Sequence, residues 1–148
     1  MYRVCDIILQ TNRVLRRGTE WIQRYRTPFF FFDRHQAVYP LYACFQEKLL
    51  ARFPESRIKV QKSQISYYNR HLYACVSFLK VKKKAELPED YFVLTLGLSA
   101  PLESDRVAAK TEPYPGRWTT HFVISNPSDL DEKLFDWIEQ AYQFAQAK

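Results

Sequence analysis

The sequence predicts one α+β domain, in which an antiparallel meander of about four to five strands carries helices on one of its faces. Three observations favour this fold class. The chain of 148 residues has the length of a single domain. It is 47% hydrophobic and 16% aromatic, which is enough apolar material for a buried core. Its apolar residues recur at helical spacing in residues 38–52 and 128–146 and alternate between these two segments.

We expect residues 29–148 to form this domain and residues 1–28 to form an N-terminal extension. The extension has a helix-like pattern over residues 12–26, although Gly18 interrupts it. The helix over residues 38–52 is clearer, because Pro40 suits a first turn and Pro54 ends the apolar pattern. Its apolar residues, spaced by three and four positions, are Val38, Leu41, Tyr42, Phe45 and Leu49.

Four strand-like runs follow, over residues 58–67, 72–79, 91–98 and 118–124. Residues 68–71 fit a hairpin turn between the first two runs. In the last run, alternation places Trp118, Thr120, Phe122 and Ile124 on one face and Thr119, His121 and Val123 on the other. Each run therefore buries one face.

The helix over residues 128–146 is expected to pack on the sheet beside the first helix. Residues 126–128 (Asn-Pro-Ser) supply a cap and a first turn, and Asp129, Asp131 and Glu132 lie where the helix dipole favours negative charge. One stripe holds its apolar side chains, which are Leu130, Leu134, Trp137, Ile138, Ala141, Tyr142 and Ala145.

Composition excludes several classes of site. With only three glycines, the chain holds neither a G-x-G-x-x-G dinucleotide loop nor a Walker phosphate loop. Its three cysteines, at positions 5, 44 and 75, fit neither a disulfide framework nor a zinc knuckle, so we expect a reducing, cytoplasmic location. Its three histidines lack metal-ligand spacing, and we expect no metal and no cofactor. No apolar run approaches the roughly 20 residues that span a bilayer, so we expect neither a signal peptide nor a membrane helix.

The charge is divided along the chain. Residues 1–84 hold 17 Lys and Arg against 5 Asp and Glu, whereas residues 85–148 hold 5 against 11. This division indicates either a basic face for nucleic acid or another polyanion, or a solvated surface whose halves neutralise each other. Lys80, Lys82, Lys83 and Lys84 would suit phosphate contacts beside the Tyr67–Tyr68 turn. Alternatively, these lysines are simply solvated or protect a sheet edge.

The best candidate for a site is the segment 99–121, because residues 99–116 show no regular element and structureless loops of this length are usually functional. Arg106 and Arg117 could hold an anion while Tyr114 and Trp118 stack on a planar group. The alternative is that both aromatic residues belong to the core and that Arg106 pairs with an acid such as Asp105 or Glu112.

His121 is either a general base, a ligand contact or a structural residue. Cys75 alternates with core positions and suits a small buried side chain better than a reactive thiolate. We therefore assign no catalytic residue and expect a non-enzyme.

Several segments resemble a bacterial domain-of-unknown-function family. They are Gln61–Tyr68 (QKSQISYY), Glu112–His121 (EPYPGRWTTH), and the helix pattern from Asp129 through Trp137 to Tyr142. The resemblance covers roughly residues 30–148 and rests on the family patterns QK[ST]QI, EPYPxRWTHH and D-x-x-x-W-[IL]-x-x-A-Y. Two departures stand out: Ser104-Asp105-Arg106-Val107 replaces SPRI, and Thr119-Thr120-His121 keeps only the second histidine of THH. The resemblance implies a small cytoplasmic domain, found alone or appended to nuclease-like or transport-associated proteins, without an established activity.

Our leading hypothesis is a non-catalytic cytoplasmic binding domain for an anionic or planar ligand. Its pocket would be formed by the segment 99–121, with Arg106, Tyr114, Arg117, Trp118 and His121, helped by Gln64 and Tyr67. Three alternatives stay open: a nucleic-acid module, an enzyme that uses His121 as general base, and an interaction domain whose apolar residues 29–32 are covered by a second copy.

Overall fold

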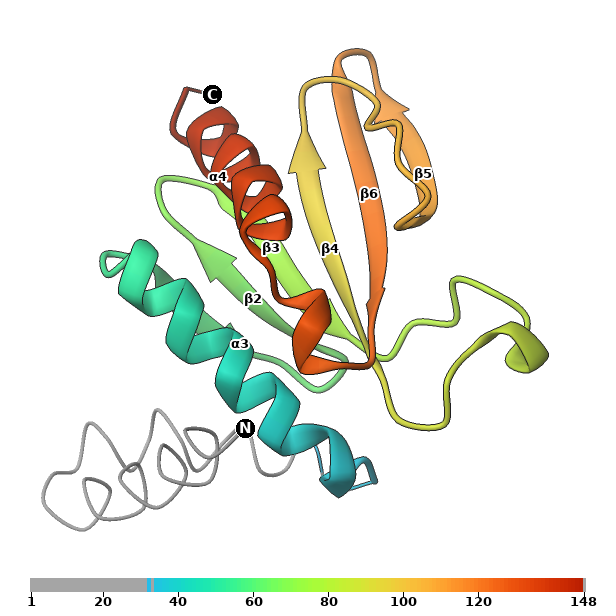
Figure 1. Ribbon diagram of the computed structural model, residues 1–148. Coiled ribbons are helices and arrows are strands. Elements are labelled where there is room, and N and C mark those ends of the chain that lie inside the picture. Colours follow the sequence, from blue (N-terminus) through green and yellow to red (C-terminus); the bar gives the residue numbers. More distant parts are fainter. Residues whose placement is uncertain (1–31, 33, 148) are drawn as a thin grey trace, which may run out of the picture.

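Six antiparallel strands form one sheet in the order β1–β2–β3–β4–β6–β5 (Figure 1). The computed structural model describes Phe32 and residues 34–147. The strands are β1 (Arg57–Val60), β2 (Gln64–Tyr68), β3 (Leu72–Ser77), β4 (Phe92–Leu98), β5 (Val107–Tyr114) and β6 (Arg117–Ile124), and the helices are α3 (Tyr39–Arg52) and α4 (Glu132–Ala147). The α+β class is thus confirmed. The N-terminal extension and its helix-like pattern lie outside the described residues.

The sheet has more strands than predicted, for two reasons. The run over residues 58–67 is not continuous, because residues 61–63 turn the chain and the Gln61 amide donates to the Gln64 carbonyl at 2.8 Å. The segment 99–116 contains β5, so the prediction that it lacks a regular element was wrong. An edge strand needs only backbone hydrogen bonds to one neighbour, and β5 accordingly shows no buried alternation in its sequence.

The order of the last strands departs from a plain meander. The strand pair predicted between residues 91–98 and 118–124 exists. β4 pairs with β6 along its whole length, with Phe92 opposite Ile124 at one end and Leu98 opposite Trp118 at the other. The chain reaches β6 only after forming β5 on the outer side of it. Gly116 permits the tight turn between β5 and β6 because its φ of 73° is a conformation that other residues rarely adopt.

Both predicted helices are present with shifted starts. A 3₁₀ helix, Gln36–Val38, leads into α3. The segment Pro127–Asp129 forms a second 3₁₀ helix, so α4 begins later than predicted. Its first turn is capped by Asp131, whose Oδ1 accepts from the Leu134 amide at 3.0 Å, and not by Asn126.

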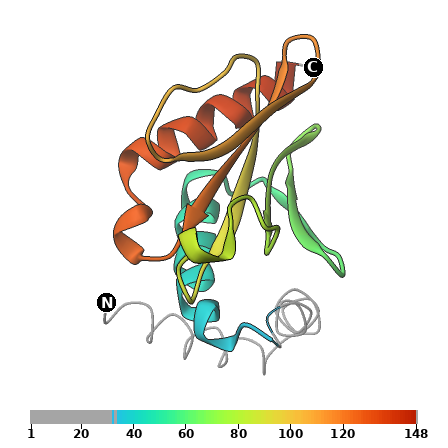
Figure 2. The same cartoon turned by 90° about the vertical axis from the view of Figure 1, so that its right-hand side faces the viewer.

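The core lies between the helices and one face of the sheet. In Figure 1 both helices lie in front of the strands, and Figure 2 shows them on the same side of the sheet from a second direction. The Phe45 ring of α3 contacts Tyr67 of β2 and Phe92 of β4, and Phe122 of β6 stacks on Trp137 of α4 at 5.3 Å. The opposite face of the sheet receives neither helix. Within the described residues, no helix is long and apolar enough to cross a membrane.

Candidate functional site

The candidate site is the face of the sheet that the helices leave open. The strand register makes Ser66, Cys75, Thr95 and His121 direct neighbours on β2, β3, β4 and β6. Lys59 extends this row onto β1. Because adjacent strands lie about 4.8 Å apart, the four central side chains form a polar band roughly 14 Å wide.

Hydrogen bonds connect this polar band. The Thr95 hydroxyl lies 2.8 Å from Nδ1 of His121, and the Cys75 thiol also bonds to Thr95. On β2, the Gln64 amide donates to the Ser66 hydroxyl at 2.9 Å. The open face is therefore an ordered set of hydrogen-bonding groups.

The two titratable groups of the band are both neutral near pH 7. Burial lowers the pKa of His121 below its ordinary value of 6.5, so the imidazole is uncharged. Burial raises the pKa of the Cys75 thiol, and its hydrogen bond with Thr95 offsets only part of this effect. Cys75 is therefore a thiol and not a reactive thiolate, although it lies half-buried on the open face and not in the core.

A cavity of about 750 Å³, which we call the near cavity, lies at one end of this face. Its lining combines cations with neutral polar and apolar groups, and comprises Arg34, His35, Lys62, Ser63, Gln64, Cys75, Ser77, Phe78, Leu79, Thr95 and His121. The His35 ring stacks on Phe78 with ring centres 3.8 Å apart. Among the residues that the structure describes, no aspartate or glutamate lines this cavity.

A second cavity of about 530 Å³, the far cavity, lies toward the other end of the strands. β3 and β4 are paired from Ala74, opposite Leu96, to Ser77, opposite Val93. The far cavity opens beyond Ala74, where the two strands separate. Arg117 and Tyr114 of the β5–β6 hairpin reach it, and Cys75 and Thr95 line both cavities.

Among the described residues, most ion pairs involve acids in or just before α4, on the helical side of the molecule. Arg52 of α3 binds Asp136 at 3.1 Å and Glu139 at 3.0 Å, both on α4. Arg106 binds Asp131 at 2.8 Å. By contrast, Arg34, Lys62 and Arg117 form no ion pair within residues 34–147. Among the described residues, the ion pairs that join the basic half of the sequence to the acidic half are those of Arg52 with acids of α4.

The residues predicted as one pocket are divided by the fold. Gln64 and His121 share the near cavity, and Arg117, Tyr114 and Trp118 line the far cavity. Trp118 also packs against the core, as the alternation along β6 requires.

Two of the predicted pocket residues lie elsewhere. Tyr67 is fully buried, and its hydroxyl donates to that of Tyr42 at 2.9 Å. Arg106 pairs with Asp131, and not with the nearby Asp105 or Glu112. The expected single pocket is therefore not assembled.

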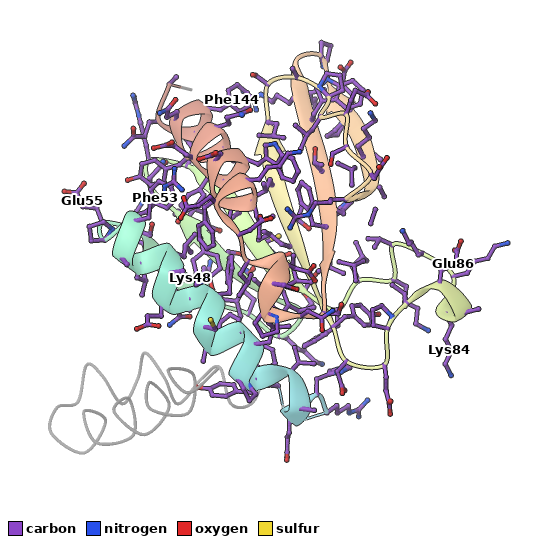
Figure 3. All side chains as sticks on the ribbon, in the orientation of Figure 1. Lys48, Phe53, Glu55, Lys84, Glu86 and Phe144 are labelled. Atoms are coloured by element: carbon purple, nitrogen blue, oxygen red, sulfur yellow. The ribbon has the colours of Figure 1, made fainter. Side chains whose placement is uncertain are left out.

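Two further expectations need correction. The loop with Lys80, Lys82, Lys83 and Lys84 leaves β3 after Ser77, which pairs with Gln64, whereas the Tyr67–Tyr68 turn lies at the opposite end of β2. Figure 3 shows Lys84 on this loop, pointing away from the sheet. Phe32 is only 1% exposed, so it offers no surface to a second copy, and residues 29–31 lie outside the described residues.

The sequence reasoning missed Arg34, His35, Lys62 and Thr95 as site residues. Lys62 lies two positions before Gln64 in the QKSQI segment, so this segment could have pointed to it. No pattern marks Arg34, because only the fold brings it to β2 and β6. Within the described residues, no group of three or more histidine, cysteine, aspartate or glutamate side chains could hold a metal ion. The role of His121 as a general base stays a prediction.

No curated protein and no solved structure matches this chain. One family model, described as a domain of unknown function (DUF5655), matches residues 30–145. This match agrees with the resemblance to an uncharacterised family, while the recognised patterns and the associations with other proteins stay predictions. Because the matched segment covers most of the chain, the protein belongs to the DUF5655 family.

Proposed function

We propose that residues 29–148 form a non-catalytic, cytoplasmic binding domain that recognises an anionic ligand in the near cavity. The observation behind this proposal is the composition of the cavity lining. Two cations, Arg34 and Lys62, line the cavity together with neutral hydrogen-bonding groups, and no described acid lines it. Both cations lack an ion-pair partner among the described residues. An anion bound in the cavity would pair with both of them.

His121 and Gln64 give the proposed site its polarity. If the Thr95 hydroxyl donates to Nδ1, the neutral His121 ring carries its proton on Nε2 and can donate it to an anion. Gln64 adds an amide beside it. In this proposal Arg34 and Lys62 take the anion-holding role that the sequence assigned to Arg106 and Arg117.

The direct test is a thermal-shift and calorimetric titration with inorganic phosphate, pyrophosphate and nucleoside 5′-monophosphates. A ligand present at 100 times its dissociation constant stabilises the fold by about 2.7 kcal/mol, which raises the melting temperature of a domain this size by about 10 °C. Lys62→Ala should weaken binding by about 10-fold or more, because a charge-assisted hydrogen bond contributes about 1.5–3 kcal/mol.

Lys84→Ala is the matched control, because Lys84 is an exposed lysine outside the near cavity. It should bind as the parent protein does. The proposal is wrong if none of these anions shifts the melting temperature, or if the Lys62→Ala and Lys84→Ala variants respond equally.

A further inference from the structure

The open face continues from the near cavity along β4 and β6. On β6, Arg117, Thr119 and His121 share this face because they alternate with the core residues Phe122 and Ile124. Arg117 lies four positions before His121, which is a distance of about 13 Å along an extended strand. Cys75 and Thr95 line both cavities, so the near and far cavities adjoin across β3 and β4, and we call the two together the groove. Its far end also reaches Phe144 of α4, where β3 and β4 separate.

The middle of this groove is empty above Gly97. Gly97 lies on β4 opposite Thr119, and no atom lies within 4 Å of the position that a Cβ would occupy there. The floor on either side consists of the small polar residues Thr95 and Thr119. A flat group can therefore lie directly on the strand backbone at Gly97.

The rim of the groove combines exposed apolar side chains with cations that form no ion pair among the described residues. Leu79 at the near cavity is 54% exposed, and Leu72 and Tyr114 at the far cavity are 39% and 66% exposed. These three are the large hydrophobic residues that are exposed in the described part of the chain. Lys62 lies at one end of the groove and Arg117 at the other. The occupant must therefore be anionic at more than one point and apolar between those points.

We propose that the groove binds single-stranded nucleic acid, which deepens the proposed function and rests on it. Phosphates contact Lys62 and Arg34 at one end and Arg117 at the other. One base lies over Gly97, and another stacks on Tyr114. Alternation of phosphate charge with flat bases matches this pattern of cations and exposed aromatic surface.

The first test blocks the middle of the groove. Gly97→Leu places a side chain in open space at a backbone position without a positive φ, so the fold should be retained. Binding of a ten-nucleotide oligothymidylate should fall by about 10-fold or more, as expected when a stacked base is lost. Binding of phosphate or thymidine monophosphate in the near cavity should not change. Ala51→Leu, which adds bulk on an exposed position of α3, is the matched control and should bind as the parent does.

The second test measures the dependence on salt. If Arg34, Lys62 and Arg117 each neutralise one phosphate, affinity for the oligonucleotide should fall by about 20-fold between 50 and 200 mM salt. Lys62→Ala and Arg117→Ala should each lower the logarithmic salt slope by about 0.7. Lys84→Ala should leave this slope unchanged.

The outcomes separate this inference from the proposed function. If phosphate binds but the oligonucleotide binds no more tightly than the mononucleotide, the groove inference is overturned and the anion site stands. If oligoglutamate of equal charge binds as tightly as the oligonucleotide, the groove takes an acidic peptide and the nucleic-acid assignment is overturned. If none of these anions binds, both proposals fail.

Discussion

Arg106→Ala should destabilise the fold while leaving ligand binding intact. Arg106 lies just before β5, and Asp131 lies just before α4, so their contact joins an edge strand to the start of a helix. Nη1 of Arg106 donates to both carboxylate oxygens of Asp131, at 2.8 and 3.0 Å, and Nη2 donates to the Asp129 carbonyl at 2.6 Å. The guanidinium also lies 5.4 Å from the centre of the Trp137 ring.

The expected loss is about 2–3 kcal/mol. The ion pair is partly exposed, with Arg106 at 28% and Asp131 at 48%, so it contributes about 0.5–1 kcal/mol. The hydrogen bond to the carbonyl contributes about 1 kcal/mol, and the contact with Trp137 contributes about 0.5–1 kcal/mol. The melting temperature should therefore fall by roughly 10 °C.

Urea denaturation followed by circular dichroism at pH 7 measures this loss. Arg117→Ala is the matched control, because Arg117 is exposed and forms no ion pair within the described residues, and it should stay within about 0.5 kcal/mol of the parent. Equal losses for the two variants would refute the reasoning. A loss of anion binding in Arg106→Ala without a loss of stability would instead support the ligand role that the sequence suggested.

The same pair has a defined pH dependence. The pKa of Asp131 lies below its ordinary value of 3.8. The largest cause is the hydrogen bond from Arg106, and the second is the hydrogen bond from the Leu134 amide. The stabilisation is therefore present above about pH 3.8 and is lost as the pH falls through the lowered pKa of the folded state. The difference in stability between the parent and Arg106→Ala should narrow under acid conditions, and a constant difference down to pH 2 would contradict this cause.

Three further predictions concern the core and the open face. Tyr42→Phe should lower the free energy of unfolding by about 2–3 kcal/mol, because the Tyr42 hydroxyl both accepts from Tyr67 and donates to Gln46. Tyr67→Phe removes only the first of these hydrogen bonds and should lower it by about 1 kcal/mol. Equal losses for the two variants in urea denaturation would exclude this chain of hydrogen bonds. Phe45→Ala should cost about 3–5 kcal/mol in the same assay, since its ring is fully buried, and a loss below about 1 kcal/mol would contradict that packing. Because burial lowers the pKa of His121, the unfolded chain binds a proton more readily, so stability should fall as the pH drops from about 6.5 toward the folded-state pKa. His121→Asn should lose this part of the pH dependence, and an unchanged slope between pH 7 and 5.5 would refute it.

Local patterns were enough to predict most of the fold. Residues three and four positions apart meet on one face of a helix whatever surrounds it, so the spacing in residues 38–52 and 128–146 predicted α3 and α4. Alternation likewise predicted β3, β4 and β6. β5 escaped this reasoning because an edge strand is fixed by its backbone bonds to β6 and not by a buried face.

The sequence by itself determined which side chains each element presents to its two faces. The alternation in β6 already placed His121 and Trp118 on opposite sides, because successive side chains of a strand point in opposite directions. Only the tertiary structure decided which of these side chains meet. His121 lies beside Thr95 because β4 pairs with β6. Lys62 reaches the same cavity from the turn before β2, and Arg34 reaches it from the segment before α3. Such neighbours depend on pairing between distant strands, which the packing of the whole core selects and no local pattern records.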